Sequence, residues 1–185
     1  MKLTKAAPEQ FSTINTIFQD SFPPEELLPV DKMQQLLENG TLELLAITDA
    51  EHHGNMALGG IIVLTHTKKT LWFLFAVAKE YRLHGIGQKI IDLVKERYGT
   101  DGFFGEVEIP DKNASETDLR VRRRNFYIRN GLKPTGIPIT MNGIPLELFT
   151  YHSEISAGEY LDFYHAVFGE EYTKRIFNIE IIETE

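Results

Sequence analysis

The amino-acid sequence predicts an α/β (α+β) fold in a single domain, with a sheet and its flanking helices drawn from the whole chain. Apolar residues at helical spacing are interspersed with the short alternating or continuous apolar runs that are typical of strands. The 185 residues are 42% hydrophobic and 11% aromatic, which is enough for a buried core around a sheet. Because no linker, repeat or charge run divides the sequence, we expect one domain over residues 1–185.

The first quarter of the chain is predicted to form two helices followed by a strand. Residues 8–18 combine a proline in the first turn with apolar residues at a 3-4-7 spacing, which is the pattern of an amphipathic helix. The prolines within residues 21–26 end this helix, because proline cannot continue a helix interior. A second helix is expected from a cap at Asp31 to a stop at residues 39–40, and Leu42–Thr48 is expected as the first strand.

The middle of the chain is predicted to hold three more strands and a helix. Met56–His66 and Leu71–Ala78 are separated by four residues, so a hairpin is the simplest connection between them. Residues 86–98 carry one apolar face and end before a glycine, as a helix does. Phe103–Ile109 alternates between apolar and polar positions, and a proline follows it.

The last third of the chain is predicted to contain two helices and three short strands. Residues 115–129 begin with serine and, three residues later, aspartate, which resembles a capping box at the start of a helix. Leu132–Thr135 and Leu146–Tyr151 are strand candidates. The aromatic residues of 156–177 indicate one amphipathic helix, and residues 179–182 indicate an edge strand.

Composition excludes several classes of function. The 27 acidic and 19 basic residues give a net charge of −8, which argues against general affinity for nucleic acid. The absence of cysteine excludes disulfides, thiolate metal sites and a cysteine nucleophile. None of the six histidines has zinc-ligand spacing, so we predict no metal. No signal peptide or membrane-spanning stretch is visible, and we expect a cytoplasmic protein.

A turn with two glycines, Arg82–Gly87, links the strand Leu71–Ala78 to the helix that follows. Glycines remove side chains that would block a ligand, and the first amides of a helix are unpaired, so the turn suits a phosphate. A Walker loop is excluded because residues 87–90 read Gly-Gln-Lys-Ile. The sequence lacks the third glycine of a dinucleotide-binding fingerprint, because Ile90 occupies that position. By itself the turn leaves a plain helix entry open as the alternative.

Two spaced motifs resemble those of the GNAT acyltransferase superfamily. Residues 77–87, Val-x4-Arg-x2-Gly-x-Gly, resemble its acetyl-CoA motif. Residues 126–132, Phe-Tyr-x3-Gly-Leu, resemble its second signature, with leucine in place of the last phenylalanine. The resemblance covers a core of about residues 2–151 and leaves a helical C-terminal extension of about residues 154–185. It implies a central mixed, mostly antiparallel sheet flanked by helices.

The resemblance also implies the activity and the cofactor. A member of this superfamily transfers an acetyl (acyl) group from acetyl-CoA directly to a primary amine through a tetrahedral intermediate, with a general base and a general acid. The absence of cysteine is consistent with direct transfer. By position in the motif, the pantetheine arm pairs with the backbone of Phe75, Ala76 and Val77, the last amide being a candidate oxyanion donor. The pyrophosphate is expected at the turn, on Arg82, Leu83, His84, Gly85, Ile86, Gly87 and Gln88.

The predicted catalytic residues are one tyrosine and two glutamates. Tyr127 matches the tyrosine of the second signature, which protonates the leaving thiolate, although an aromatic residue packed on a helix face is the alternative. Glu106 and Glu108 share one face of the strand Phe103–Ile109 and are candidates for the general base, against a solvated strand face. We prefer Glu108, which lies closer to the end of the strand. The family's asparagine before the tyrosine is replaced by Arg120.

The acceptor and the partners are left open by the sequence. A small-molecule amine is the leading prediction, and the alternatives are a protein amine or a non-catalytic acyl-CoA-binding module. The three arginines of residues 122–124 point in different directions on a helix, so one faces phosphates or an acidic acceptor, or all are solvated. The aromatic tail covers either the chain's own sheet or a second copy, which would make a homodimer. We expect neither nucleic acid nor a membrane as a partner.

Overall fold

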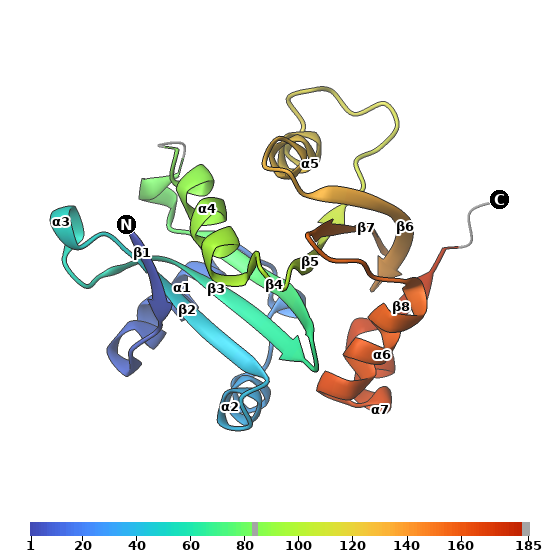
Figure 1. The fold of residues 1–185 in the computed structure, drawn as a ribbon, viewed down its shortest axis with the longest axis horizontal. Coiled ribbons are helices and arrows are strands. Elements are labelled where there is room, and N and C mark those ends of the chain that lie inside the picture. Colours follow the sequence, from blue (N-terminus) through green and yellow to red (C-terminus); the bar gives the residue numbers. More distant parts are fainter. Residues whose placement is uncertain (83–84, 183–185) are drawn as a thin grey trace. The chain divides into compact units, whose positions relative to one another are not determined.

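The structure is a computed structural model that describes residues 1–82 and 85–182 (Figure 1). The chain divides into two compact units, one made of Met1–Thr65 with Leu71–Tyr98 and the other of His66–Thr70 with Gly99–Glu185. Each unit combines antiparallel strands with helices, as expected from the mixture of patterns along the sequence. The single-domain organisation stays a prediction.

The first unit is built on antiparallel strands whose positions were predicted closely. Strand β1 pairs with β2, and β2 pairs with β3, both antiparallel. The amide of Ala78, just after β4, donates to the carbonyl of Leu58 in β3 at 2.9 Å. The bounds of β2 are those predicted, and β4 begins two residues earlier than predicted. The strands are β1 (Lys2–Lys5), β2 (Leu42–Thr48), β3 (Ala57–His66) and β4 (Lys69–Val77).

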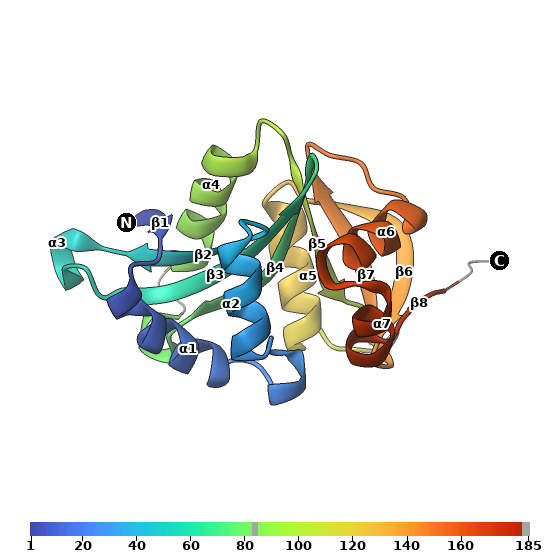
Figure 2. The ribbon, with the colours of Figure 1, turned by 90° about the horizontal axis from the view of Figure 1, so that it is seen from below.

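Helices cover both sides of these strands. Figure 2 shows α1 and α2 on one side and α4 on the other. Helix α1 packs so closely that a Cβ atom at Gly60 of β3 would come within 2.4 Å of Ile14 Cγ2. The helices of this unit are η1 (Pro8–Gln10), α1 (Phe11–Gln19), η2 (Pro24–Glu26), α2 (Val30–Glu38), α3 (Ala50–His53), η3 (Lys79–Tyr81) and α4 (Ile86–Tyr98).

Two details of the first unit differ from the prediction. Helix α2 begins at Val30 with Pro29 as its N-cap, so Asp31 is not the cap but lies in the first turn. Its carboxylate still favours the helix there, because the first turn carries the positive end of the dipole. The turn-rich segment after β2 contains a single helical turn, α3, that was not predicted.

The second unit has four antiparallel strands in the order β5-β7-β6-β8. Because side chains alternate along a strand, Phe104 and Glu106 of β5 share one face with Leu148 of β7. Phe149 lies on the opposite face. The strands are β5 (Phe103–Glu108), β6 (Lys133–Met141), β7 (Ile144–Tyr151) and β8 (Ile179–Ile181).

The helices of the second unit pack on opposite faces of these strands (Figure 1). The ring of Phe104 makes an edge contact with Phe163 of α6, at 5.3 Å between centroids. On the other face, the Arg124 guanidinium of α5 lies 5.6 Å from the ring centroid of Phe149. These helices are α5 (Leu119–Arg129), α6 (Ala157–Phe168), α7 (Glu170–Tyr172) and η4 (Thr173–Phe177).

The predictions for this unit needed three corrections. Asp118 is the N-cap of α5 and accepts a hydrogen bond from the Arg120 amide at 2.8 Å, whereas Ser115 pairs with the Thr117 hydroxyl. Strand β6 runs to Met141, well past the predicted end. The tail is not one helix, because Gly169, with φ of +89°, ends α6. The predicted edge strand is confirmed, since β8 pairs with β6.

Substitutions of two glycines test how closely the chain before β5 approaches the chain after β7. Gly102 (φ +76°) precedes β5, and a Cβ there would lie 2.4 Å from the His152 carbonyl oxygen, whereas Gly143 (φ +78°) has open space around it. We expect Gly143→Ala to cost about 1 kcal/mol through its left-handed backbone alone. Gly102→Ala should cost about 3 kcal/mol, because overpacking against backbone atoms is added. Denaturant unfolding of both variants measures this, and equal losses would contradict the close approach.

Candidate functional site

The predicted cofactor segment begins in the first unit, where β4 ends. Phe75 is half-buried, and Ala76 and Val77 are buried. The chain then passes through η3 into the glycine turn and α4. Two of the predicted cofactor-binding residues, Leu83 and His84, lie outside the described residues.

Gly85, in the described part of the glycine turn, has a backbone conformation that favours glycine. Gly85 has φ of +72°, a conformation that side chains disfavour, and among the described residues beyond its chain neighbours no atom lies within 4 Å of a Cβ placed there. Its carbonyl accepts a hydrogen bond from the Lys89 amide, and residues 86–88 form the first turn of α4. Amides at this position in a helix have no intrahelical acceptor and carry positive partial charge. The start of α4 is therefore suited to an anion.

Arg82 is held by the protein around the turn. Its Nε donates to the Val77 carbonyl at 2.8 Å, and its Nη2 donates to Ser21 Oγ at 2.9 Å. The Ser21 hydroxyl in turn donates to the carbonyl of Ile17 in α1 at 2.6 Å. The guanidinium thus links the end of β4 to the end of α1. Ser21 was missed in the sequence, because nothing local indicates a partner 61 residues away.

Gly59 of β3 is a second residue that sequence reasoning missed. A Cβ atom there would lie 2.5 Å from the Ala76 carbonyl oxygen and 3.2 Å from Val77 Cα. Such distances are too short for any side chain, so only glycine lets β3 approach the end of β4 in this way. The one available signal was the pair of adjacent glycines inside an apolar strand.

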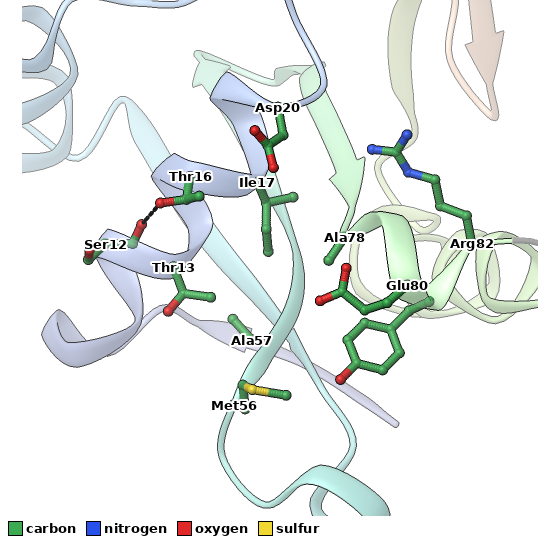
Figure 3. A pocket seen from close by; sticks show the side chains of 11 residues that line it. Ser12, Thr13, Thr16, Ile17, Asp20, Met56, Ala57, Ala78, Glu80 and Arg82 are labelled. Carbon is green, nitrogen blue, oxygen red and sulfur yellow. Dashed lines mark hydrogen bonds between the residues drawn. The ribbon is translucent and has the colours of Figure 1, made fainter.

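A pocket of about 290 Å³ with a mixed polar and apolar lining lies in the first unit, beside Arg82 (Figure 3). Helix α1 contributes hydroxyl groups, Asp20 at its C-cap contributes a carboxylate, and η3 contributes the Glu80 carboxylate. Arg82 is the predicted site residue that lines it. The pocket is bounded by Ser12, Thr13, Thr16, Ile17, Asp20, Met56, Ala57, Ala78, Glu80, Tyr81 and Arg82.

The three predicted catalytic residues all belong to the second unit, and Glu106 has the most constrained surroundings. It is half-buried, and its Oε1 accepts hydrogen bonds from the hydroxyls of Tyr160 at 2.8 Å and Tyr164 at 2.7 Å. Burial raises the pKa of the Glu106 carboxyl, and the hydrogen bonds from Tyr164 and Tyr160 oppose this rise. Burial and the neighbouring carboxylate hold the pKa of both tyrosines well above its usual range, so both are donors at neutral pH.

Glu108 lies on the same strand but has a different partner. Its Oε2 accepts a hydrogen bond from Arg123 Nη1 of α5 at 3.1 Å. Arg124, the next residue, pairs with Glu147 of β7 at 3.1 Å, so the run of arginines does divide between different groups. Arg120 is paired with Asp111 at 2.8 Å and with its own cap, Asp118.

Tyr127 lies near the C-terminal end of α5 and is half-buried. Its ring makes an edge contact with Phe126, at 5.5 Å between centroids. Burial raises the pKa of the Tyr127 hydroxyl, and the positive charge of Arg123, one turn earlier, opposes the rise. The phenol therefore keeps its proton at neutral pH, as a general acid must.

Among the residues that the structure describes, one cluster of potential metal ligands occurs, in the connection between β2 and β3. Asp49, Glu51 and His52 offer ligand atoms that lie within 4.8 Å of one another. Asp49 is already engaged, because its Oδ2 lies 2.9 Å from His52 Nδ1. Nothing else there indicates an ion, and the prediction that the chain uses no metal stays a prediction. Among the described helices, none combines the length and apolar character needed to cross a membrane.

The surroundings of Glu106 predict how stability changes with pH. A carboxyl whose pKa is raised by folding binds its proton more tightly in the native state, so its effect on stability becomes unfavourable as the pH rises above about 4.5. We therefore expect the stability of Glu106→Gln, relative to that of wild type, to increase as the pH rises. The increase should be about 1.4 kcal/mol for each unit by which folding raises the pKa of Glu106. Urea unfolding between pH 4.5 and 8 measures this. A difference that does not vary with pH would show that Glu106 titrates normally.

We compared the chain with protein-family models, with curated protein sequences and with solved structures. No family model matches the chain, and no curated protein sequence does. Among solved structures, a GNAT-family acetyltransferase from Bacteroides thetaiotaomicron, itself described as putative, is 18% identical with a TM-score of 0.70, covering 93% of this chain and 98% of its own. An aminoglycoside 6'-N-acetyltransferase complexed with coenzyme A is 14% identical with a TM-score of 0.58, covering 84% and 99%. The ribosomal-protein-S18-alanine N-acetyltransferase from Escherichia coli is 15% identical with a TM-score of 0.56, covering 84% and 96%.

These likenesses extend over most of this chain and nearly all of each neighbour, and they confirm the fold class that the two motifs predicted. Because the identities are below 20%, the likenesses establish the fold alone. The reaction has to be argued from the residues of the site. The chain has the fold of the GNAT acetyltransferases.

Proposed function

We propose that this protein is an N-acetyltransferase that transfers the acetyl group of acetyl-CoA to a primary amine of a small molecule. The observation that carries the proposal is the glycine turn in its structural setting. Gly85 has the left-handed backbone and directly precedes Ile86, the first residue of α4. This arrangement suits a pyrophosphate, and one structural neighbour is complexed with coenzyme A.

Acetyl-CoA is proposed to bind along the backbone of the first unit. The amides of residues 86–88, with those of Leu83 and His84, would hold the pyrophosphate. The pantetheine arm would pair with the backbone of residues 75–77, and the Val77 amide would donate to the oxyanion. Gly59 supports this role because it lets β3 lie close to the Ala76 carbonyl. Arg82 supports it by holding the Val77 carbonyl at 2.8 Å, so its side chain acts on the backbone that binds the ligand.

The reaction needs a base for the amine and an acid for the thiolate. We propose Glu106 as the base, because burial raises its pKa and both tyrosine hydroxyls converge on Oε1, leaving Oε2 clear of them. The proton of the amine passes to Glu106 as the C–N bond forms. Collapse of the tetrahedral intermediate breaks the C–S bond, and Tyr127 protonates the thiolate. Glu108 remains the second candidate, although Arg123 competes for its lone pairs.

The acceptor is proposed to be a cationic small molecule. The net charge of −8 attracts such an amine over long range. The structural neighbours include one enzyme named for an aminoglycoside and one named for a ribosomal protein, so acylation of a protein amine is the second possibility. A non-catalytic acyl-CoA-binding module is the third. The cytoplasmic location and the partners stay predictions, including a homodimer through the tail.

Glutamate variants test the assignment of the base. We expect Glu106→Gln to lower kcat/KM by about 10²–10⁴-fold, because a general base contributes about that much to the rate. Glu108→Gln, the matched change two residues along the same strand face, should lower it by less than about tenfold. Release of free thiol from acetyl-CoA, with a panel of polyamines, aminoglycosides and basic peptides as acceptors, measures both. The reverse order of effects would assign the base to Glu108.

Ligand binding distinguishes between an acetyltransferase and a non-catalytic acyl-CoA-binding module. Acetyl-CoA should raise the Tm, because it binds the native state, whereas adenine dinucleotides should not. Stabilisation by acetyl-CoA without thiol release on any amine would favour the non-catalytic module, and release only with peptides would favour a protein acceptor. If no CoA ester stabilises the protein, the proposed function is wrong.

A further inference from the structure

The C-terminal extension supplies both hydrogen-bond donors to the carboxylate of Glu106. Tyr160 and Tyr164 are four residues apart in α6, so they lie on the same face of the helix. Neither side chain is exposed to solvent. Their hydroxyls reach the same oxygen, Oε1, from a helix that begins some 50 residues after β5 in the sequence.

The rings of both tyrosines are fixed by aromatic packing. The Tyr160 ring meets Phe104 of β5 at 6.3 Å between centroids, and the Tyr164 ring meets Phe177 of η4 at 5.1 Å. The two tyrosine rings are themselves 5.0 Å apart. Because packed rings cannot rotate freely, each hydroxyl has a set position, and the carboxylate must adapt to them. The hydrogen bonds therefore determine which way the Glu106 side chain points.

The other groups around Glu106 offer little compensation for its charge. Leu148 lies opposite on β7, and Phe104 is the next residue along the same face of β5. Glu108, two residues further, is paired with Arg123 of α5. From α6, Tyr160 and Tyr164 donate hydrogen bonds to Glu106. These hydrogen bonds favour the ionised carboxylate.

We propose that Tyr160 and Tyr164 are positioning residues, through which the C-terminal extension orients the carboxylate of Glu106 and keeps it ionised to accept the amine proton. The inference rests on the proposed role of Glu106 as the base. It gives the extension a function in the reaction beyond covering the sheet. Neither tyrosine touches the reacting atoms in this scheme, so both act only through Glu106.

The test removes each hydroxyl while keeping the ring. Tyr160→Phe and Tyr164→Phe should each raise the pKa of Glu106 further, by roughly one unit, since a hydrogen bond to a charged group is lost. The acid limb of the kcat/KM profile should then move to higher pH by the same amount. Tyr172→Phe is the matched control, because its ring stacks on Phe168 in the same cluster but its hydroxyl is not one of the donors to Glu106. Its profile should coincide with that of wild type.

A second readout needs no acceptor. The stability lost in Tyr160→Phe and Tyr164→Phe should grow as the pH rises from 5 to 8, because the pKa of Glu106 in the native state is higher in the variants. In a Glu106→Gln background this pH-dependent part should vanish. Losses that are independent of pH in both backgrounds, with unshifted kinetic profiles, would overturn the inference. If instead Glu106→Gln leaves turnover intact while the stability cycle behaves as expected, the assignment of the base fails and the hydrogen-bonding role stands.

Discussion

A half-buried carboxylate that lies opposite an apolar side chain of the neighbouring strand is the constraint on which the second unit depends. Glu106 lies between Phe104 and the end of β5, opposite Leu148, and a charge in that position costs free energy unless donors reach it. The two tyrosine hydroxyls of α6 meet that need at 2.8 and 2.7 Å. The aromatic cluster and the capping box at Ser156 in turn hold α6 where its hydroxyls can reach. The C-terminal extension is therefore part of the structure that surrounds the candidate base.

In the first unit, the residues of the candidate site position main-chain groups rather than side chains for the proposed ligand. Glycine at position 59 admits the close approach of β3 to Ala76, and Arg82 fixes the Val77 carbonyl from the other direction. Gly85 then turns the chain so that the first amides of α4 follow. All three residues act on main-chain groups. This explains why a motif of so few side chains is compatible with neighbours that share under 20% of their residues with this chain.

Local signals were predicted well, and contacts between distant residues were not. Strand β2, the helix stop at Gly99 and the left-handed backbone of Gly85 follow from patterns within a few residues, and the structure has them. The continuation of β6 was hidden because Pro134, Gly136 and Pro138 look like a turn, although the strand accommodates them with a shift of register. The pairs Arg82–Ser21 and Glu106–Tyr160 join residues 61 and 54 positions apart, and no local pattern specifies such a partner. The choice between Glu108 and Glu106 as the base stays a prediction.

The account joins a structural property of Glu106, its raised pKa, to a chemical role, the acceptance of the amine proton. Titration of the Glu106 carboxyl carbon by NMR, in the free protein labelled with carbon-13, measures the first property directly. The acid limb of kcat/KM reports the pKa of the essential base in the same free enzyme. We predict that the two midpoints coincide and lie above 4.5, the ordinary value for a glutamate. A carboxyl that titrates at a pH different from that of the kinetic limb would contradict the account.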